Sequence, residues 1–182
     1  MIVDPQTGLL DQARQIHSPN FDDRPPDTAV DLLVVHNISL PPGQFGGPWI
    51  DDLFTNQLDP SAHPYFKDIH NLRVSAHVLI RRSGEIVQYV PFHKRAWHAG
   101  QSQYCGRERC NDFSIGVELE GCDTQAFEDC QYQQLAIMIK ALLQTYPGLS
   151  VEHIVGHNDI APERKTDPGP FFDWPKLRRL LS

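Results

Sequence analysis

The sequence predicts a single α/β domain, residues 1–182, in which helices flank a central mixed β-sheet of about five strands. Three observations lead to this fold class. The chain has 182 residues, a length that suits one compact domain. Short apolar runs of strand length recur along the chain, and one long segment has clear helical periodicity. Hydrophobic residues make up 40% of the chain and charged residues 21%, so an ordinary globular core can form.

Three strands are expected in the first half of the chain. Residues 30–36 contain an apolar run without alternation, which is typical of a central strand covered on both faces. Residues 74–80 and 85–90 are apolar-rich runs on either side of a short loop that contains Gly84. This arrangement predicts a β-hairpin.

Two further strands are expected in the second half of the chain. Residues 113–119 alternate along their length, as a strand with two different faces does. The apolar face comprises Phe113, Ile115, Val117 and Leu119. The other face comprises Ser114, Gly116 and Glu118. Residues 153–157 predict a short fifth strand.

One helix has a strong signal in the sequence. From Leu135, apolar residues recur at the i, i+3, i+4, i+7 and i+8 positions, which predicts a helix over residues 135–146. Pro147 and Gly148 end it. We expect a closing helix over residues 174–181 and a short helix over residues 49–58.

Residues 37–72 form a long excursion between two strands. Proline and glycine occupy six of the eight positions from 41 to 48, so no regular pattern continues through them. Long excursions between strands are often lids or binding loops. We therefore interpret residues 37–72 as a lid segment beside His36.

The charge and the N-terminus limit the classes of function. The formal net charge is −7, which argues against a non-specific nucleic-acid binder and against docking on anionic lipid. No run approaches the ~18 apolar residues of a membrane span. Asp4 and Pro5 interrupt the position where a signal peptide would have its hydrophobic block. We expect a cytoplasmic protein without a nucleic-acid or membrane partner.

The four cysteines, Cys105, Cys110, Cys122 and Cys130, have no C-x2-C spacing. This spacing is the one that common zinc knuckles use. We expect reduced, non-catalytic thiols.

Two histidines and an aspartate form a candidate metal site. His36 follows a buried strand, His157 ends another, and Asp167 lies ten residues further on. Two histidines and a carboxylate make a three-ligand zinc site that leaves a fourth position open, which is the catalytic arrangement. Each histidine by itself is more often a polar cap on a strand. Nine histidines in the chain also make chance pairs easy.

Two charged residues are candidates for catalysis. Glu118 lies on the strand face that carries small side chains, where a substrate would have room. The alternative is a solvent-facing residue, as Glu120 is expected to be. Lys165 lies two residues before Asp167, so in an extended segment both side chains point the same way. A cation there could stabilise an oxyanion, although a surface lysine is the usual case. His77 and His98 could also lie beside the site, whereas His63 and His70 carry no functional signal.

Four segments of the chain resemble the zinc N-acetylmuramoyl-L-alanine amidases: VVHNISLPPGQFGGPWI, VSAHVLIRRSGEIVQYVPFHKRAWHAG, CNDFSIGVELEG and GHNDIAPERKTDPGP. The resemblance extends over roughly residues 17–175 and is strongest to the cytoplasmic anhydro-N-acetylmuramyl-L-alanine amidases, the AmpD type. The wider group includes phage T7-lysozyme-type amidases and peptidoglycan recognition proteins.

The resemblance implies a role for each matching residue. The implied Zn2+ ligands are His36, His157 and Asp167. The implied catalytic residues are Glu118 and Lys165. The residues implied to contact the sugar and lactyl portion are Asn37 and Trp97, and those implied to meet the peptide carboxylates are Arg73 and Arg109. One position departs from the family: Asn158 stands where a cysteine usually follows the second ligand histidine.

The resemblance also implies an activity, which is zinc-dependent hydrolysis of the amide between the lactyl group of (anhydro-)N-acetylmuramic acid and L-alanine. We expect a monomer that acts on small soluble muropeptides in peptidoglycan recycling. A non-catalytic muropeptide binder would lack Glu118 or a ligand. A zinc peptidase of unrelated fold would carry an H-E-x-x-H helix motif, which the sequence lacks. An amidase of the intact wall would be expected to have a leader or a wall-binding module.

Overall fold

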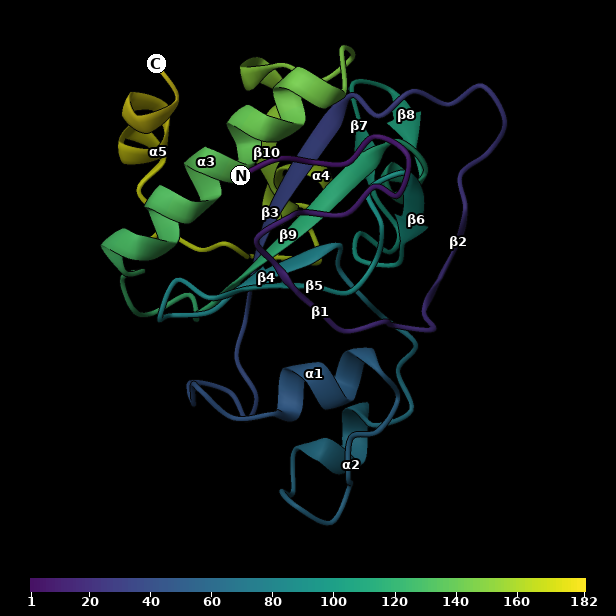
Figure 1. The fold of residues 1–182 in the computed structure, drawn as a ribbon. Coiled ribbons are helices and arrows are strands. Elements are labelled where there is room, and N and C mark those ends of the chain that lie inside the picture. The colour runs from purple at the N-terminus through teal and green to yellow at the C-terminus, as the bar shows by residue number, and fades with distance from the viewer.

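The computed structural model describes residues 1–182, and a six-stranded mixed sheet runs through its centre (Figure 1). Its strand order is β1-β5-β4-β9-β3-β10. Only β4 and β5 pair antiparallel, and all other neighbours are parallel. The strands are β1 (Arg14–Gln15), β3 (Leu32–Ile38), β4 (Val78–Ile80), β5 (Ile86–Gln88), β9 (Ser114–Glu120) and β10 (Ile154–Gly156).

Two small sheets and five helices surround the main sheet. The small sheets are antiparallel pairs of β2 (Phe21–Asp23) with β6 (Lys94–Ala96), and of β7 (Gln103–Tyr104) with β8 (Arg107–Glu108). The α-helices are α1 (Trp49–Phe54), α2 (Phe66–Ile69), α3 (Asp129–Thr145), α4 (His157–Ile160) and α5 (Trp174–Leu181). Short 3-10 turns occur at Cys110–Asp112 and Val151–His153. None of these helices is long and apolar enough to span a bilayer.

Helices α3 and α5 cover one face of the sheet (Figure 1). Burying one apolar stripe of α3 on the sheet gives the largest core cluster of the molecule. This cluster includes Leu33 and Val35 of β3, Ile115, Val117 and Leu119 of β9, and Leu135, Met138, Ile139 and Leu142 of α3. The buried Gln131 also donates from its amide to the carbonyls of Ile80 and Glu120. The helix is thereby held on β4 and β9, and the opposite face of the sheet is left for other segments.

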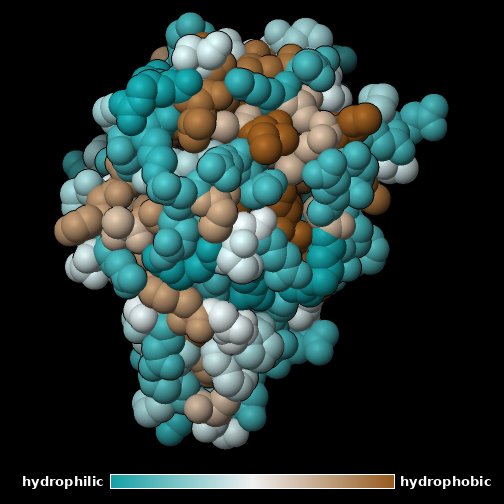
Figure 2. Space-filling view, turned by 60° about the vertical axis from the view of Figure 1, so that its left-hand side comes forward, coloured by the Kyte–Doolittle hydropathy of each residue, from teal (hydrophilic) through white to brown (hydrophobic).

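A second core forms where α1 and α2 pack below the sheet, in the narrower lower part of the molecule (Figures 1 and 2). Its buried side chains include Leu40, Ile50, Leu53, Phe54 and Phe66 of this segment together with Leu79, Val87 and Tyr89 of the hairpin. On the face shown in Figure 2, hydrophobic atoms form small groups separated by hydrophilic ones. The buried contacts of this second core hold α1 and α2 against the hairpin.

The five strands expected from the sequence are present, and the β4–β5 hairpin is confirmed. The sixth strand, β1, was not predicted, because its two exposed residues carry no apolar pattern. The assignment of Phe113 to the apolar face of the strand was wrong. Phe113 precedes β9 and packs with Leu32 and Val34 in a separate cluster.

The segment 37–72 is more ordered than its composition suggests. It begins inside β3, and it contains α1 and the unexpected short helix α2. Its glycine-rich loop is tied to the sheet, because Gly46 donates to Glu120 Oε1 and Arg81 donates to the carbonyl of Gly47. The expectation that Glu120 faces solvent was wrong: Glu120 is only 2% exposed and pairs with Arg81.

We propose that any lid motion of residues 37–72 is confined to the loop at 41–48. In the free protein, amide hydrogen exchange in this loop should be faster than in β3 and β9, because the loop has few backbone hydrogen bonds. Mass spectrometry of peptide fragments would measure it. The helix α1, whose apolar side chains are buried, should exchange more slowly than the loop. Strong and uniform protection over residues 37–72 would contradict a lid.

Candidate functional site

Three residues from different segments meet at the carboxyl ends of β3 and β10. His36 is the fifth residue of β3, and His157 is the first residue of α4, directly after β10. These strands are parallel neighbours, with Gly156 opposite Val35, so the next residues on each strand lie side by side. Asp167 approaches from the loop after α4. Strand ends are rigid, so they place such side chains well.

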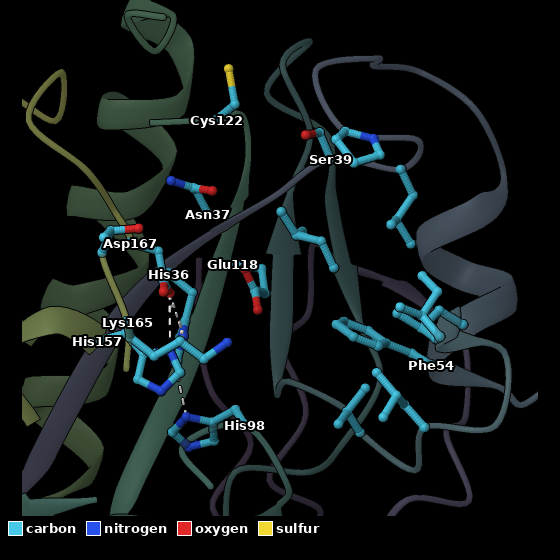
Figure 3. A pocket seen from close by; sticks show the side chains of 18 of the residues that line it. His36, Asn37, Ser39, Phe54, His98, Glu118, Cys122, His157, Lys165 and Asp167 are labelled. Atoms are coloured by element: carbon cyan, nitrogen blue, oxygen red, sulfur yellow. Dashed lines mark hydrogen bonds and ion pairs between the residues drawn. The ribbon is translucent and has the colours of Figure 1, made fainter. Parts of the chain in front are cut away.

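The three side chains form a close triangle (Figure 3). His36 Nδ1 lies 2.9 Å from His157 Nδ1. Asp167 Oδ2 lies 3.0 Å from each of these nitrogens. Both histidines are only 2% exposed. The three atoms could hold a metal ion.

The hydrogens of the ligand side chains point away from the centre of the triangle. His157 Nε2 donates to the carbonyl of Ala99 at 3.1 Å, which places a hydrogen on Nε2 and makes Nδ1 the nitrogen available to a metal. Burial lowers the pKa of His36 to about 4, and it holds the pKa of His98 well below the ordinary value. The site therefore presents acceptor atoms to a common centre.

A zinc ion suits this donor set. Two imidazole nitrogens and one carboxylate oxygen are a usual set for catalytic zinc, and they leave a fourth position open. Bonds of about 2.0–2.2 Å in a tetrahedron place ligand atoms roughly 3.3–3.6 Å apart. The separations in the triangle, 2.9 to 3.0 Å, are a few tenths of an ångström shorter.

Glu118 lies beside the triangle on the neighbouring strand. In the β3–β9 register it is opposite His36, and Figure 3 shows its carboxyl between the triangle and the wall that carries Phe54. Its Oε2 is buried and has no hydrogen-bond partner. Burial raises the pKa of Glu118 well above its ordinary value, the charge of Asp167 raises it further, and Lys165 lowers it. An unpartnered carboxyl with a raised pKa is suited to accept a proton.

Lys165 reaches the same cavity from the loop of Asp167 (Figure 3). Its ammonium forms no ion pair in the structure. The neighbouring Arg164 donates to the carbonyls of Ala99 and Gln101. Lys165 and Asp167 both line this cavity, but Arg164 and Thr166 line it too, so alternation along an extended segment is not what brings them together.

The triangle opens into a cavity of about 550 Å3, which is within the usual range for ligand sites. One wall carries the polar residues of the sheet and the Asp167 loop. The other wall belongs to the segment 37–72 and to the residues just after it, and its side chains include Phe54, Tyr65, Ile69 and Leu72. The cavity thus combines one reactive polar wall with one largely apolar wall.

Two of the four expected substrate-binding residues line this cavity. Trp97 does so, and its indole N–H donates to Asp22 Oδ1 at 3.2 Å, which holds the ring in place. Asn37 also lines it, but its amide donates to Asp123 Oδ1 at 2.6 Å and to the carbonyl of Pro168 at 3.0 Å. The side-chain carbonyl oxygen of Asn37 remains available to accept a hydrogen bond from a ligand.

The two expected arginines lie outside the main cavity. The side chain of Arg109 is 70% exposed and pairs with Asp112. It lines a neighbouring cavity of about 420 Å3, which shares Arg164 with the main one. Arg73 is exposed and lies between two cavity-lining residues, Leu72 and Val74.

The residues that hold the Asp167 loop were not predicted from the sequence. Asp123 accepts hydrogen bonds from Asn37 and from Thr166 Oγ1, the latter at 2.5 Å, and so ties this loop to the end of β3. Its position after a strand gave no signal. Cys122 also lines the cavity, and all four cysteines are unpaired. His77 lies within the sheet, where its Nδ1 accepts the N–H of Gly116.

Comparison with known proteins identifies the family to which the chain belongs. The family model of the N-acetylmuramoyl-L-alanine amidases matches residues 26–170. The 1,6-anhydro-N-acetylmuramyl-L-alanine amidase AmpD of Escherichia coli is 66% identical over 177 residues, which are 97% of this chain and 96% of that protein.

Solved structures show the same likeness. The crystal structure of a selenomethionine AmpD derivative superposes with a TM-score of 0.96 at 64% identity, and the match covers all of both chains. The Escherichia coli amidase AmiD, in complex with its substrate anhydro-N-acetylmuramic acid-L-Ala-D-gamma-Glu-L-Lys, is 31% identical. That match has a TM-score of 0.61 and covers 86% of this chain and 60% of that one. This chain, with its His-His-Asp triangle at the base of a ligand-sized cavity, belongs to the N-acetylmuramoyl-L-alanine amidase family.

Proposed function

We propose that this amidase uses zinc to hydrolyse the amide between the lactyl group of anhydro-N-acetylmuramic acid and L-alanine. Its substrates would be small soluble muropeptides in the cytoplasm, as part of peptidoglycan recycling. The full-length likeness to AmpD of Escherichia coli supports this substrate class. The anhydromuramyl peptide bound to the related AmiD supports it as well.

One observation carries the zinc proposal, namely the triangle of His36 Nδ1, His157 Nδ1 and Asp167 Oδ2. These acceptor atoms repel one another unless a cation lies between them. A zinc ion held there would supply Lewis acidity, which makes water a nucleophile near neutral pH and polarises the amide carbonyl.

The chain's own residues would move the protons and stabilise the charge. Glu118 would accept the proton of the attacking water, and its raised pKa suits that task. It would then deliver this proton to the nitrogen of the departing alanine. The Lys165 ammonium, which has no carboxylate partner, would stabilise the negative charge that develops on the carbonyl oxygen.

The two walls of the cavity suit the two halves of a muropeptide. Trp97 offers a flat apolar surface to a sugar ring, and the carbonyl oxygen of Asn37 can accept a hydroxyl or amide hydrogen. Arg109 and Arg73 would meet the carboxylates of the peptide stem outside the main cavity, where an arginine can donate two parallel hydrogen bonds. All these residues come from one chain, so a monomer would suffice.

A non-catalytic muropeptide binder is the alternative from another class. Such a protein has no need of a buried carboxyl with an unpartnered oxygen beside the metal ligands. Glu118 has that position here, which favours the enzyme.

Replacing His157 by Ala should remove zinc and activity together, because one corner of the triangle is lost. Zinc content after dialysis, measured by elemental analysis, and amide hydrolysis would be followed in parallel. His153→Ala is the matched control, because His153 is exposed four residues earlier. A chelator should abolish activity, and zinc should restore it. Full activity in a verified metal-free preparation would contradict the proposal.

Glu118→Ala should keep its zinc and lose about 10²–10⁴-fold in kcat, the usual contribution of a general base. Lys165→Ala should also keep zinc and lose kcat rather than raise KM, because its target charge exists only in the transition state. Lys140→Ala, an exposed lysine on α3, serves as the control. A Lys165→Ala variant with raised KM and unchanged kcat would assign Lys165 to ground-state binding.

A soluble anhydromuramyl peptide should be cleaved faster than purified sacculi at matched bond concentration. Equal rates would contradict the recycling assignment but not the amidase chemistry. Arg109→Ala should raise KM for a substrate with an acidic stem more than for anhydromuramyl-L-alanine. Arg107→Ala is a matched control, because the guanidinium of Arg107 lies over Phe113 and pairs with Asp31. Equal effects of Arg109→Ala on both substrates would exclude a carboxylate contact.

A further inference from the structure

Each histidine of the triangle has a second ring nitrogen that points away from it. His157 Nε2 meets the carbonyl of Ala99 at 3.1 Å, and His36 Nε2 lies 2.9 Å from His98 Nδ1 (Figure 3). The two outer nitrogens therefore contact two consecutive residues, His98 and Ala99. Their backbone is held by Asn111, whose Oδ1 accepts the N–H of His98 at 3.1 Å and that of Ala99 at 2.8 Å.

A carbonyl can only accept a hydrogen bond, so Ala99 leaves no choice for His157. The ring of His98 could either donate or accept at Nδ1. The protonation of His36 therefore depends on which nitrogen of His98 carries the hydrogen.

The contacts of Ser114, on the far side of the His98 ring, determine which nitrogen of His98 carries the hydrogen. Its Oγ lies 2.6 Å from the carbonyl of Cys110 and 3.2 Å from His98 Nε2. A serine hydroxyl has one hydrogen, and the carbonyl of Cys110 cannot supply another. The short contact therefore uses the Ser114 hydrogen, and Ser114 Oγ must accept from His98 Nε2–H. His98 Nδ1 is then an acceptor, so His36 donates from Nε2 and keeps the lone pair of Nδ1 inside the triangle.

The strand β9 is shaped to hold the His98 ring. A side-chain carbon added to Gly116 would lie 2.3 Å from His98 Cγ, so only glycine leaves room there. Ser114 is fully buried two residues before Gly116, on the same face of the strand. The small residues that the alternation predicted beside Glu118 thus also seat a histidine.

We propose that His98, in the tautomer set by Ser114, is a positioning residue that holds His36 as an Nε2-protonated ligand with Nδ1 directed at the metal. The inference rests on the zinc site of the proposed function. Hydrogen bonds to the outer nitrogen of a ligand histidine fix its tautomer and its ring orientation, and their loss commonly weakens metal binding 10–100-fold. His98 lines the cavity but would not itself be a ligand of the metal.

Nuclear magnetic resonance tests the tautomers directly on the unaltered protein. Zinc is diamagnetic, so long-range 15N–1H correlations can be recorded on zinc-loaded protein with 15N-labelled histidine. We expect His98 to be neutral and protonated on Nε2, and His36 to be protonated on Nε2 with the metal at Nδ1. A His98 ring protonated on Nδ1 would overturn the proposal.

Zinc affinity provides a second readout that does not depend on activity. Competition with a chromophoric chelator should show about 10–100-fold weaker zinc binding for His98→Phe, which keeps a ring but offers no acceptor. Ser114→Ala should weaken binding in the same direction. His98→Asn should recover part of the loss, because its amide oxygen can accept near the position of Nδ1. Ser18→Ala is the matched control. The hydroxyl of Ser18 is also buried and also donates to a carbonyl, that of Phe54, but it contacts no histidine.

The outcomes separate this inference from the proposed function. A wild-type protein that binds no zinc would overturn both. Wild-type zinc binding with unchanged affinity in folded His98→Phe and Ser114→Ala would overturn the positioning role alone. Loss in both variants, with Ser18→Ala at the wild-type affinity and partial recovery in His98→Asn, would support it.

Discussion

The structure is organised around three acceptor atoms that face one another at 2.9 to 3.0 Å: His36 Nδ1, His157 Nδ1 and Asp167 Oδ2. Such atoms repel without a cation, so the surrounding fold must hold them in place. Two of the three come from parallel neighbours in the sheet, β3 and β10, where the strand register sets their separation. The third depends on a loop, which Asp123 ties back to the sheet through Asn37 and Thr166.

The strand β9 connects this constraint to the rest of the molecule. It pairs with both β3 and β4, and α3 packs on its other face, so it is held on all sides. The site-facing residues of β9 have different roles, which follow from the size of their side chains. Gly116 and Ser114 make room for His98, whereas Glu118 projects its unpartnered carboxyl toward the cavity. Glu120 at its end ties down the loop of the 37–72 segment.

Much of this arrangement is readable from the sequence, because the relevant signals are local. An apolar run or an alternating run indicates a strand, and a strand end indicates a rigid position for His36 or His157. The missing parts depend on contacts between distant segments. The strand β1 exists only because it pairs with β5, and Glu120 is buried only because Arg81 reaches it. The Nε2 atom of His98 has a partner only because Ser114 is folded against it. The arginines predicted from family resemblance lie at the rim of the site, where the free protein shows no contact that reveals their role.

We propose that the triangle holds zinc through the Nδ1 atoms of both histidines. A crystal structure of zinc-loaded protein, with anomalous data collected on both sides of the zinc absorption edge, would locate the ion and its ligands. We expect one peak per chain, about 2.0–2.2 Å from His36 Nδ1, His157 Nδ1 and an oxygen of Asp167. A peak bound to the Nε2 atom of either histidine, or strong zinc binding only elsewhere on the chain, would contradict it.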